Sequence, residues 1–272
     1  MQSWELVRSC LRQSFERQGS SVAIDKDGYV PNPCDNLLPC VHLKDFEADL
    51  KRGAGKELEK NFRAVHSSSA LAVNCFAPFR QRIADLALPG IAAGFDSLQF
   101  ESECPSGLGG QPPTLDVLLR GRHVVVAIES KLTEFLGDSK KAEFSHAYSQ
   151  ICDGRREQPY FRAMRRLMDN PETYVRLDAA QLIKHAFGLE YRFPKLPVTL
   201  LYLFWEPANP GRAPEFAQHR KEIADFTKRV EGSKVAFKSM SYPKLWEEWR
   251  SGAQEWLFKH LDNLEQRYLV EI

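Results

Sequence analysis

Residues 113–131 read PTLDVLLRGRHVVVAIESK and carry the clearest structural signal in this chain. It contains two strand-like runs, 115–119 and 124–129, joined by the short polar segment 120–123, and this order predicts a β-hairpin. Side chains alternate between the two faces of a strand, so Glu129 and Lys131 are expected to point the same way.

The pairing of the two strands predicts that Asp116 shares that face. With Leu119 opposite Val124, four residues form the loop, and Asp116 pairs with Ala127, diagonally from Glu129. A two-residue loop gives the same face, whereas a three-residue loop without a bulge reverses it. The other face is then expected to be an unbroken apolar layer: Leu115, Val117, Leu119, Val124, Val126 and Ile128.

Two carboxylates and an amine on one face indicate metal chemistry. Two acids buried close together are costly unless a cation lies between them. A hard divalent ion such as Mg²⁺, or Mn²⁺, would relieve that repulsion, position a water and stabilise charge on a phosphate. Lys131 could orient that water, deprotonate it, or bind the phosphate as a point charge. To act as the base that deprotonates the water, Lys131 would need a lowered pKa.

This pattern resembles the PD-(D/E)XK nuclease superfamily, which includes restriction endonucleases and repair nucleases. The resemblance rests on Pro113-Thr114-Leu115-Asp116 and on Glu129-Ser130-Lys131, although two residues separate the proline from Asp116. It implies that Asp116 and Glu129 hold Mg²⁺ and that Lys131 assists the attack of water on a phosphodiester of DNA. A wider similarity, over about residues 50–205, is to a family of restriction endonuclease-like proteins.

The resemblance also implies further members of the site. Many members of the superfamily add a glutamate from the preceding helix, and Glu57 and Glu59 are the candidates here. We favour Glu57 as a third metal ligand because it falls in the first turn of a helix expected at about 56–76. An acid that stabilises a helix N-terminus is the competing interpretation. Gln150, on the helix expected after Lys131, could contact the metal-bound water or the phosphate.

The order of the remaining elements predicts an α/β fold. Apolar periodicity indicates a mixed central β-sheet flanked by helices, the restriction endonuclease-like core. The chain of 272 residues is expected to form a single domain, 1–272, with the nuclease-like core at about 50–205 and additions at both ends: an N-terminal helix and loop, and a C-terminal strand and helix. We expect helices at about 1–16, 56–76, 79–88, 139–154, 159–168, 179–187, 215–230 and 243–268, and further strands at about 97–103, 198–205 and 234–239.

Charge is informative by its distribution. The net charge is +1, but five arginines fall within a short segment and are candidates to bind phosphates: Arg155, Arg156, Arg162, Arg165 and Arg166. The competing interpretation is a solvated helix face. No long apolar run predicts a membrane span, so a cytoplasmic protein is expected, with nucleic acid as partner and a homodimer as an option that no residue decides.

Three interpretations therefore compete. The first is a Mg²⁺-dependent endonuclease, a hydrolase. The second is a nucleic-acid-binding or interaction protein that keeps this fold but does not cut. The third is a structural role, in which Lys131 forms an ion pair with Asp116 or Glu129 at the end of a strand. No Walker or dinucleotide-binding motif appears in the sequence, so neither ATP nor NAD is expected.

Overall fold

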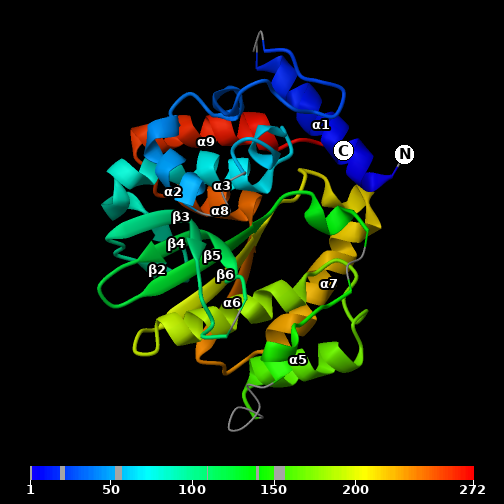
Figure 1. Cartoon of the computed structure of the whole chain (residues 1–272). Coiled ribbons are helices and arrows are strands. Elements are labelled where there is room, and N and C mark those ends of the chain that lie inside the picture. The colour runs from blue at the N-terminus through cyan, green and yellow to red at the C-terminus, as the bar shows by residue number, and fades with distance from the viewer. Residues whose placement is uncertain (1, 19–21, 53–56, 109, 139–140, 150–156) are drawn as a thin grey trace.

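A five-stranded mixed sheet forms the centre of the protein (Figure 1). The computed structural model describes residues 2–18, 22–52, 57–108, 110–138, 141–149 and 157–272. Within them the strand order is β3-β4-β5-β6-β7. The strands are β3 (Ser97–Glu103), β4 (Thr114–Arg120), β5 (Val125–Lys131), β6 (Val198–Phe204) and β7 (Val235–Ser241), and a small ribbon pairs β1 (Ala87–Leu88) with β2 (Ala92–Ala93).

The sheet changes direction at β5. Strands β3, β4 and β5 pair antiparallel, whereas β5, β6 and β7 pair parallel. Antiparallel strands can be joined by a tight loop, while each parallel pair needs a helical crossover. The α/β class and the mixed sheet expected from the sequence are therefore confirmed.

Helices cover both faces of the sheet (Figure 1). On one face lie α3 (Ser68–Phe76), α8 (Tyr242–Arg250) and α9 (Glu255–Tyr268), with α1 (Ser3–Arg17) packed on α9. On the other lie α5 (Pro159–Asp169), α6 (Ala179–Arg192) and α7 (Pro214–Arg229). Two shorter helices are α2 (Glu47–Arg52) and α4 (His146–Ser149). No helix in the described parts of the chain is long and apolar enough to cross a membrane.

The hairpin strands are buried on both faces because helices cover both. Leu115, Val117, Val126 and Ile128 are fully buried, and Leu118 and Ala127 on the opposite face are buried as well. The same core cluster contains residues from Val7 to Ile272. The division into a core at about 50–205 with terminal additions stays a prediction, and β7, beyond that range, pairs in parallel with β6.

Four predicted helices differ from the structure. The helix expected at 79–88 is replaced by two short 3₁₀ turns, Ala77–Gln81 and Ile83–Asp85, followed by β1. Of the helix expected at 139–154, residues 141–145 are not helical, α4 covers His146–Ser149, and the remainder lies outside the described residues. The helix expected at 56–76 begins only at Ser68, because the Ser67 side chain accepts a hydrogen bond from Ala70 N and so caps a new helix there. The closing helix expected at 243–268 is two helices, α8 and α9, separated by a turn at Ser251 and Gly252.

Candidate active site

The hairpin register, extended by one position beyond its last pair of Val117 with Ile128, places Asp116 level with Glu129. The ladder pairs Leu118 with Ala127 and Val117 with Ile128, two positions away from the predicted pairing of Asp116 with Ala127. That predicted pair is wrong because the loop-closing pair is Arg120 with Val125. The shift is an even number of residues, so the shared face that the sequence predicted is kept.

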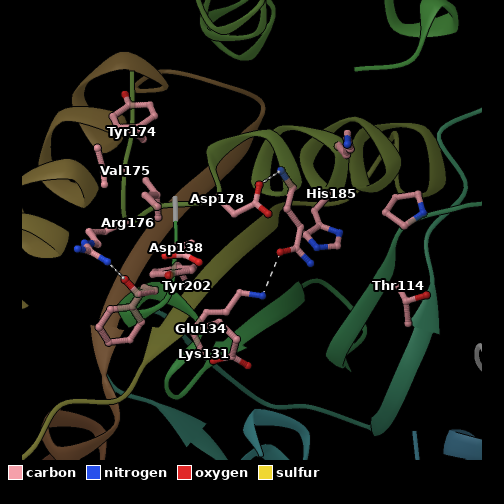
Figure 2. A pocket seen from close by; sticks show the side chains of 15 residues that line it. Thr114, Lys131, Glu134, Asp138, Tyr174, Val175, Arg176, Asp178, His185 and Tyr202 are labelled. Carbon is pink, nitrogen blue, oxygen red and sulfur yellow. Dashed lines mark hydrogen bonds between the residues drawn. The ribbon is translucent and has the colours of Figure 1, made fainter. Parts of the chain in front are cut away.

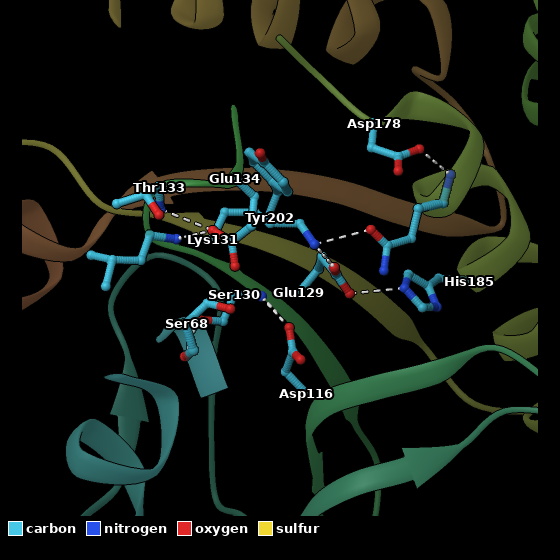
Figure 3. Close-up of polar contacts among 12 residues, drawn as sticks. Ser68, Asp116, Glu129, Ser130, Lys131, Thr133, Glu134, Asp178, His185 and Tyr202 are labelled. Atoms are coloured by element: carbon cyan, nitrogen blue, oxygen red, sulfur yellow. Dashed lines mark hydrogen bonds and ion pairs between the residues drawn. The ribbon is translucent and has the colours of Figure 1, made fainter. Parts of the chain in front are cut away.

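Asp116 lies where the two hairpin strands separate. The ladder pairs between them end at Val117 and Ile128, and the main-chain N–H of Ser130 donates to Asp116 Oδ2 at 2.6 Å instead (Figure 3). The carboxylate therefore reaches the main chain between Glu129 and Lys131. Burial, followed by the negative charges of Glu129 and Glu101, raises the pKa of Asp116 well above its ordinary value.

Glu129 is the buried centre of the cluster, with 1% of its surface exposed. Its Oε1 lies 2.5 Å from Lys131 Nζ, and its Oε2 lies 2.8 Å from His185 Nε2 (Figure 3). Burial alone would raise the pKa of Glu129, but the charges of Lys131 and His185 outweigh it and lower the pKa to about 2. Glu129 is therefore an ionised carboxylate that is almost fully excluded from solvent.

Lys131 is a buried cation held at two points. Its ammonium contacts Glu129 and donates to Gln181 Oε1 at 3.0 Å, and 16% of its side chain is exposed. Burial lowers the pKa of Lys131, but Glu129, Glu134 and Asp116 together raise it above its ordinary value. That direction is opposite to the one a general base requires, so the arrangement favours Lys131 as a fixed positive charge.

Glu101 is an acid of this cluster that the sequence did not reveal. On β3 its neighbours Phe100 and Ser102 pair with Val117 and Leu115, so Glu101 stands level with Asp116. Its φ of 47° interrupts the ladder at that point. Burial and the charges of Glu57 and Glu129 raise the pKa of Glu101 to about 7. Alternation along the predicted strand 97–103 was the available signal, because Glu101 shares the face of Gln99 and not that of Phe100.

Glu57 lies near the row of acids formed by Glu101, Asp116 and Glu129, although not for the predicted reason. No helix begins at this residue; Glu57 sits in a turn and accepts hydrogen bonds from Ser69 Oγ at 2.8 Å and Asn61 Nδ2 at 3.1 Å. Its charge acts on Glu101, whereas Asp116 responds to Glu101 and Glu129. A role for Glu57 as third metal ligand stays a prediction, and Glu59 is exposed.

Helix α6 supplies two contacts that the sequence analysis missed. Gln181 and His185 stand four residues apart, which puts both on one face of the helix, and they touch Lys131 and Glu129 respectively. Asp178 caps the helix by accepting from Gln181 N at 2.9 Å. The helix predicted to lie beside the site carried Gln150, which lies outside the described residues. The available signal was the pair of polar residues at helical spacing within an otherwise apolar segment.

The arginines divide into two groups. Arg155 and Arg156 lie outside the described residues. Three others, Arg162, Arg165 and Arg166, are exposed on α5. The aromatic residues between them, Tyr160 and Phe161, are 5% and 1% exposed and belong to the core, so they offer no stacking surface. Nucleic-acid binding by these arginines stays a prediction.

A pocket of about 460 Å³ opens beside the cluster (Figure 2). Its wall includes Lys131, Gln181 and His185 from the cluster, with Lys184 and Tyr202 next to them. The pocket brings solvent and any ligand up to the exposed part of the Lys131 side chain. It also contains charges of both signs, among them Glu134, Asp138, Arg176 and Asp178.

The two carboxylates suit a hard divalent cation, but the described part of the protein supplies few ligands for it. Among the residues that the structure describes, no three His, Cys, Asp or Glu side chains converge to hold a metal ion. Asp116 and Glu129 are two oxygen donors on adjacent strands. Burial first, and then the negative charges of Glu129 and Glu101, raise the pKa of Asp116, and a cation would relieve the repulsion between these charges. Mg²⁺ commonly uses one or two carboxylates and keeps several waters, so two acids suffice for it.

The comparisons with known proteins gave one family. Residues 11–269 match the family model described as "Restriction Endonuclease associating with ARP". No curated protein and no solved structure matches the chain.

Proposed function

The chain belongs to the family described as Restriction Endonuclease associating with ARP, and from this premise we propose that it is a Mg²⁺-dependent nuclease that hydrolyses phosphodiester bonds of DNA. The observation that carries the proposal is the convergence of Asp116, Glu129 and Lys131 at the ends of two sheet strands. The family description also names an association with ARP. We propose ARP as a partner of this chain and do not assign a binding surface for it.

Each residue of the cluster has a distinct task in this proposal. Asp116 and Glu129 hold the divalent ion, and Mn²⁺ is an acceptable substitute. The ion supplies a water of lowered pKa and stabilises charge on the phosphate. Lys131, kept positive by its acidic neighbours, binds a phosphate oxygen or orients the attacking water, and Gln181 fixes its ammonium.

The buried surroundings strengthen these charges. Glu129 is almost wholly excluded from solvent, and electrostatic interactions are larger where water is absent. The pocket is lined by Lys131, Gln181 and His185 but not by Asp116 or Glu129, so it would bring a phosphate of DNA to the Lys131 ammonium. Exposed arginines on α5 would add affinity through phosphates without reading the base sequence.

Cleavage assays on the purified chain test the proposal. Plasmid DNA and labelled oligonucleotides are expected to be cut with Mg²⁺ or Mn²⁺ and not with EDTA. Asp116→Ala and Lys131→Ala should each remove this activity, whereas Asp169→Ala, an exposed acid on α5, should retain it. Robust cleavage by the first two variants would overturn the proposal.

The third acid is tested in the same assay. Glu101 acts on Asp116 directly, whereas Glu57 acts on Glu101. We propose that Glu101→Gln lowers activity more than Glu57→Gln does. The reverse order would restore Glu57 as the stronger candidate for third ligand.

A second candidate is a protein that binds nucleic acid without cutting it. The close Glu129–Lys131 ion pair favours this reading, because that pair neutralises one acid without any metal. It predicts DNA binding with no Mn²⁺ uptake in calorimetry. A steep fall of DNA affinity with salt, lessened in Arg162→Ala and Arg165→Ala, would show that the α5 surface takes part in either case.

A further inference from the structure

A buried histidine contacts Glu129, one of the two acids proposed to hold the metal ion. His185 and Glu129 are each 1% exposed, and His185 Nε2 lies 2.8 Å from Glu129 Oε2. The other oxygen, Oε1, faces Lys131 at 2.5 Å. The two carboxylate oxygens therefore have different neighbours, one from α6 and one from β5 itself.

The position of His185 is fixed by the packing of its helix. Asp178 caps α6 one turn before Gln181, and Gly188 follows His185 by three residues. A Cβ atom at Gly188 would meet Cys104 O at 2.3 Å, so the helix backbone lies directly against the end of β3. A close approach of this kind leaves α6 little freedom to shift, and the imidazole is held with it.

From these contacts we propose that His185 is a positioning residue: it holds Glu129 Oε2, so that Oε1, which contacts the Lys131 ammonium here, is the oxygen available to the divalent ion. The inference rests on the proposed function. A glutamate side chain has several rotatable bonds, and fixing one oxygen removes most of that freedom before a ligand binds. Carboxylates that bind metals are themselves held by hydrogen-bonding neighbours, whose loss weakens metal affinity or activity by about 10–100-fold.

If the His185–Glu129 contact only stabilises the fold, a different result is expected. Its loss would lower the stability of the fold and leave the intrinsic affinity for a cation nearly unchanged. A positioning role instead depends on which atom of the side chain at position 185 reaches Glu129. Two amide replacements separate these cases, because the glutamine amide nitrogen can occupy the place of Nε2, whereas the shorter asparagine cannot reach it.

The experiment is Mn²⁺ calorimetry on the full chain, with urea unfolding in EDTA as the stability readout. His185→Asn is expected to raise the Kd for Mn²⁺ by about 10–100-fold. His185→Gln should stay within a few-fold of the wild type. Equal Mn²⁺ affinity for His185→Asn and the wild type, or equal losses in both variants, would overturn the positioning role.

Failure of the proposed function gives a different result. If the wild type takes up no Mn²⁺, or if Asp116→Ala binds it as tightly as the wild type, the metal site itself is refuted and the role of His185 falls with it. If the wild type binds Mn²⁺ through Asp116 and the two His185 variants behave alike, only the inference on His185 is lost.

Discussion

Removing the charge of Asp116 should make the protein more stable. Burial and the neighbouring acids Glu129 and Glu101 raise the pKa of Asp116, so its ionisation opposes folding. Asparagine removes the charge and keeps an oxygen that can accept from Ser130 N. We expect Asp116→Asn to raise the free energy of unfolding at pH 7 by about 1 kcal/mol, within the range of about 0.5–2 kcal/mol common for a single stabilising substitution.

The pH dependence of this gain follows from the direction of the shift. A carboxyl whose folded pKa lies above its unfolded pKa contributes its full stability below the unfolded value and loses it as pH rises. The advantage of Asp116→Asn should therefore be present at pH 7 and vanish as the pH falls toward about 4.

Urea unfolding in EDTA measures the effect at each pH. Asp169→Asn, which removes an exposed carboxylate at the C-terminal end of α5, is the matched control and should change stability by less than about 0.5 kcal/mol. An Asp116→Asn protein that is no more stable than the wild type at pH 7, or whose advantage persists unchanged at pH 4, would refute this account of the cluster.

Three other predictions concern the surroundings of the site. Lys131→Met should lower the free energy of unfolding in EDTA by about 3 kcal/mol, because Glu129 stays buried without its ammonium partner. A loss under about 1 kcal/mol in urea unfolding would count against a tight pair. Gly188→Ala should destabilise the protein by about 1–3 kcal/mol, since the new methyl group meets Cys104 O; an unchanged melting temperature would contradict the close helix–strand approach. Burial, helped by nearby arginines, lowers the pKa of His219 to about 3. As the pH falls below about 6.5, the free energy of unfolding of the wild type should therefore decrease by about 1.4 kcal/mol per pH unit relative to that of His219→Gln. Free energies of unfolding that change in parallel with pH in the two proteins would contradict this.

The parts of the site predicted from sequence are those set by local geometry. Alternation along a strand put Glu129 and Lys131 on one face, and parity brought Asp116 to the same side even though the register was two positions off. The loop-closing pair, Arg120 with Val125, depends on how the turn packs and could not be read from the residues that form it.

The missed parts depend on contacts between distant segments. His185 and Gln181 reach the hairpin only because α6 crosses from β5 to β6 over this face of the sheet. The start of α3 was missed for a different reason: apolar spacing over 56–76 imitated a helix, and the cap at Ser67 was the stronger local signal. Polar residues at helical spacing and a capping serine therefore predict the site contacts and the helix start better than the apolar pattern alone.

A crystal structure of the protein soaked in Mn²⁺ would show whether Asp116 and Glu129 bind a metal ion together. We expect one ion bound by oxygens of both Asp116 and Glu129, at about 2.0–2.2 Å from each, with Lys131 close by. No ion between those two carboxylates at saturating Mn²⁺, with Lys131 still closed on Glu129, would contradict it.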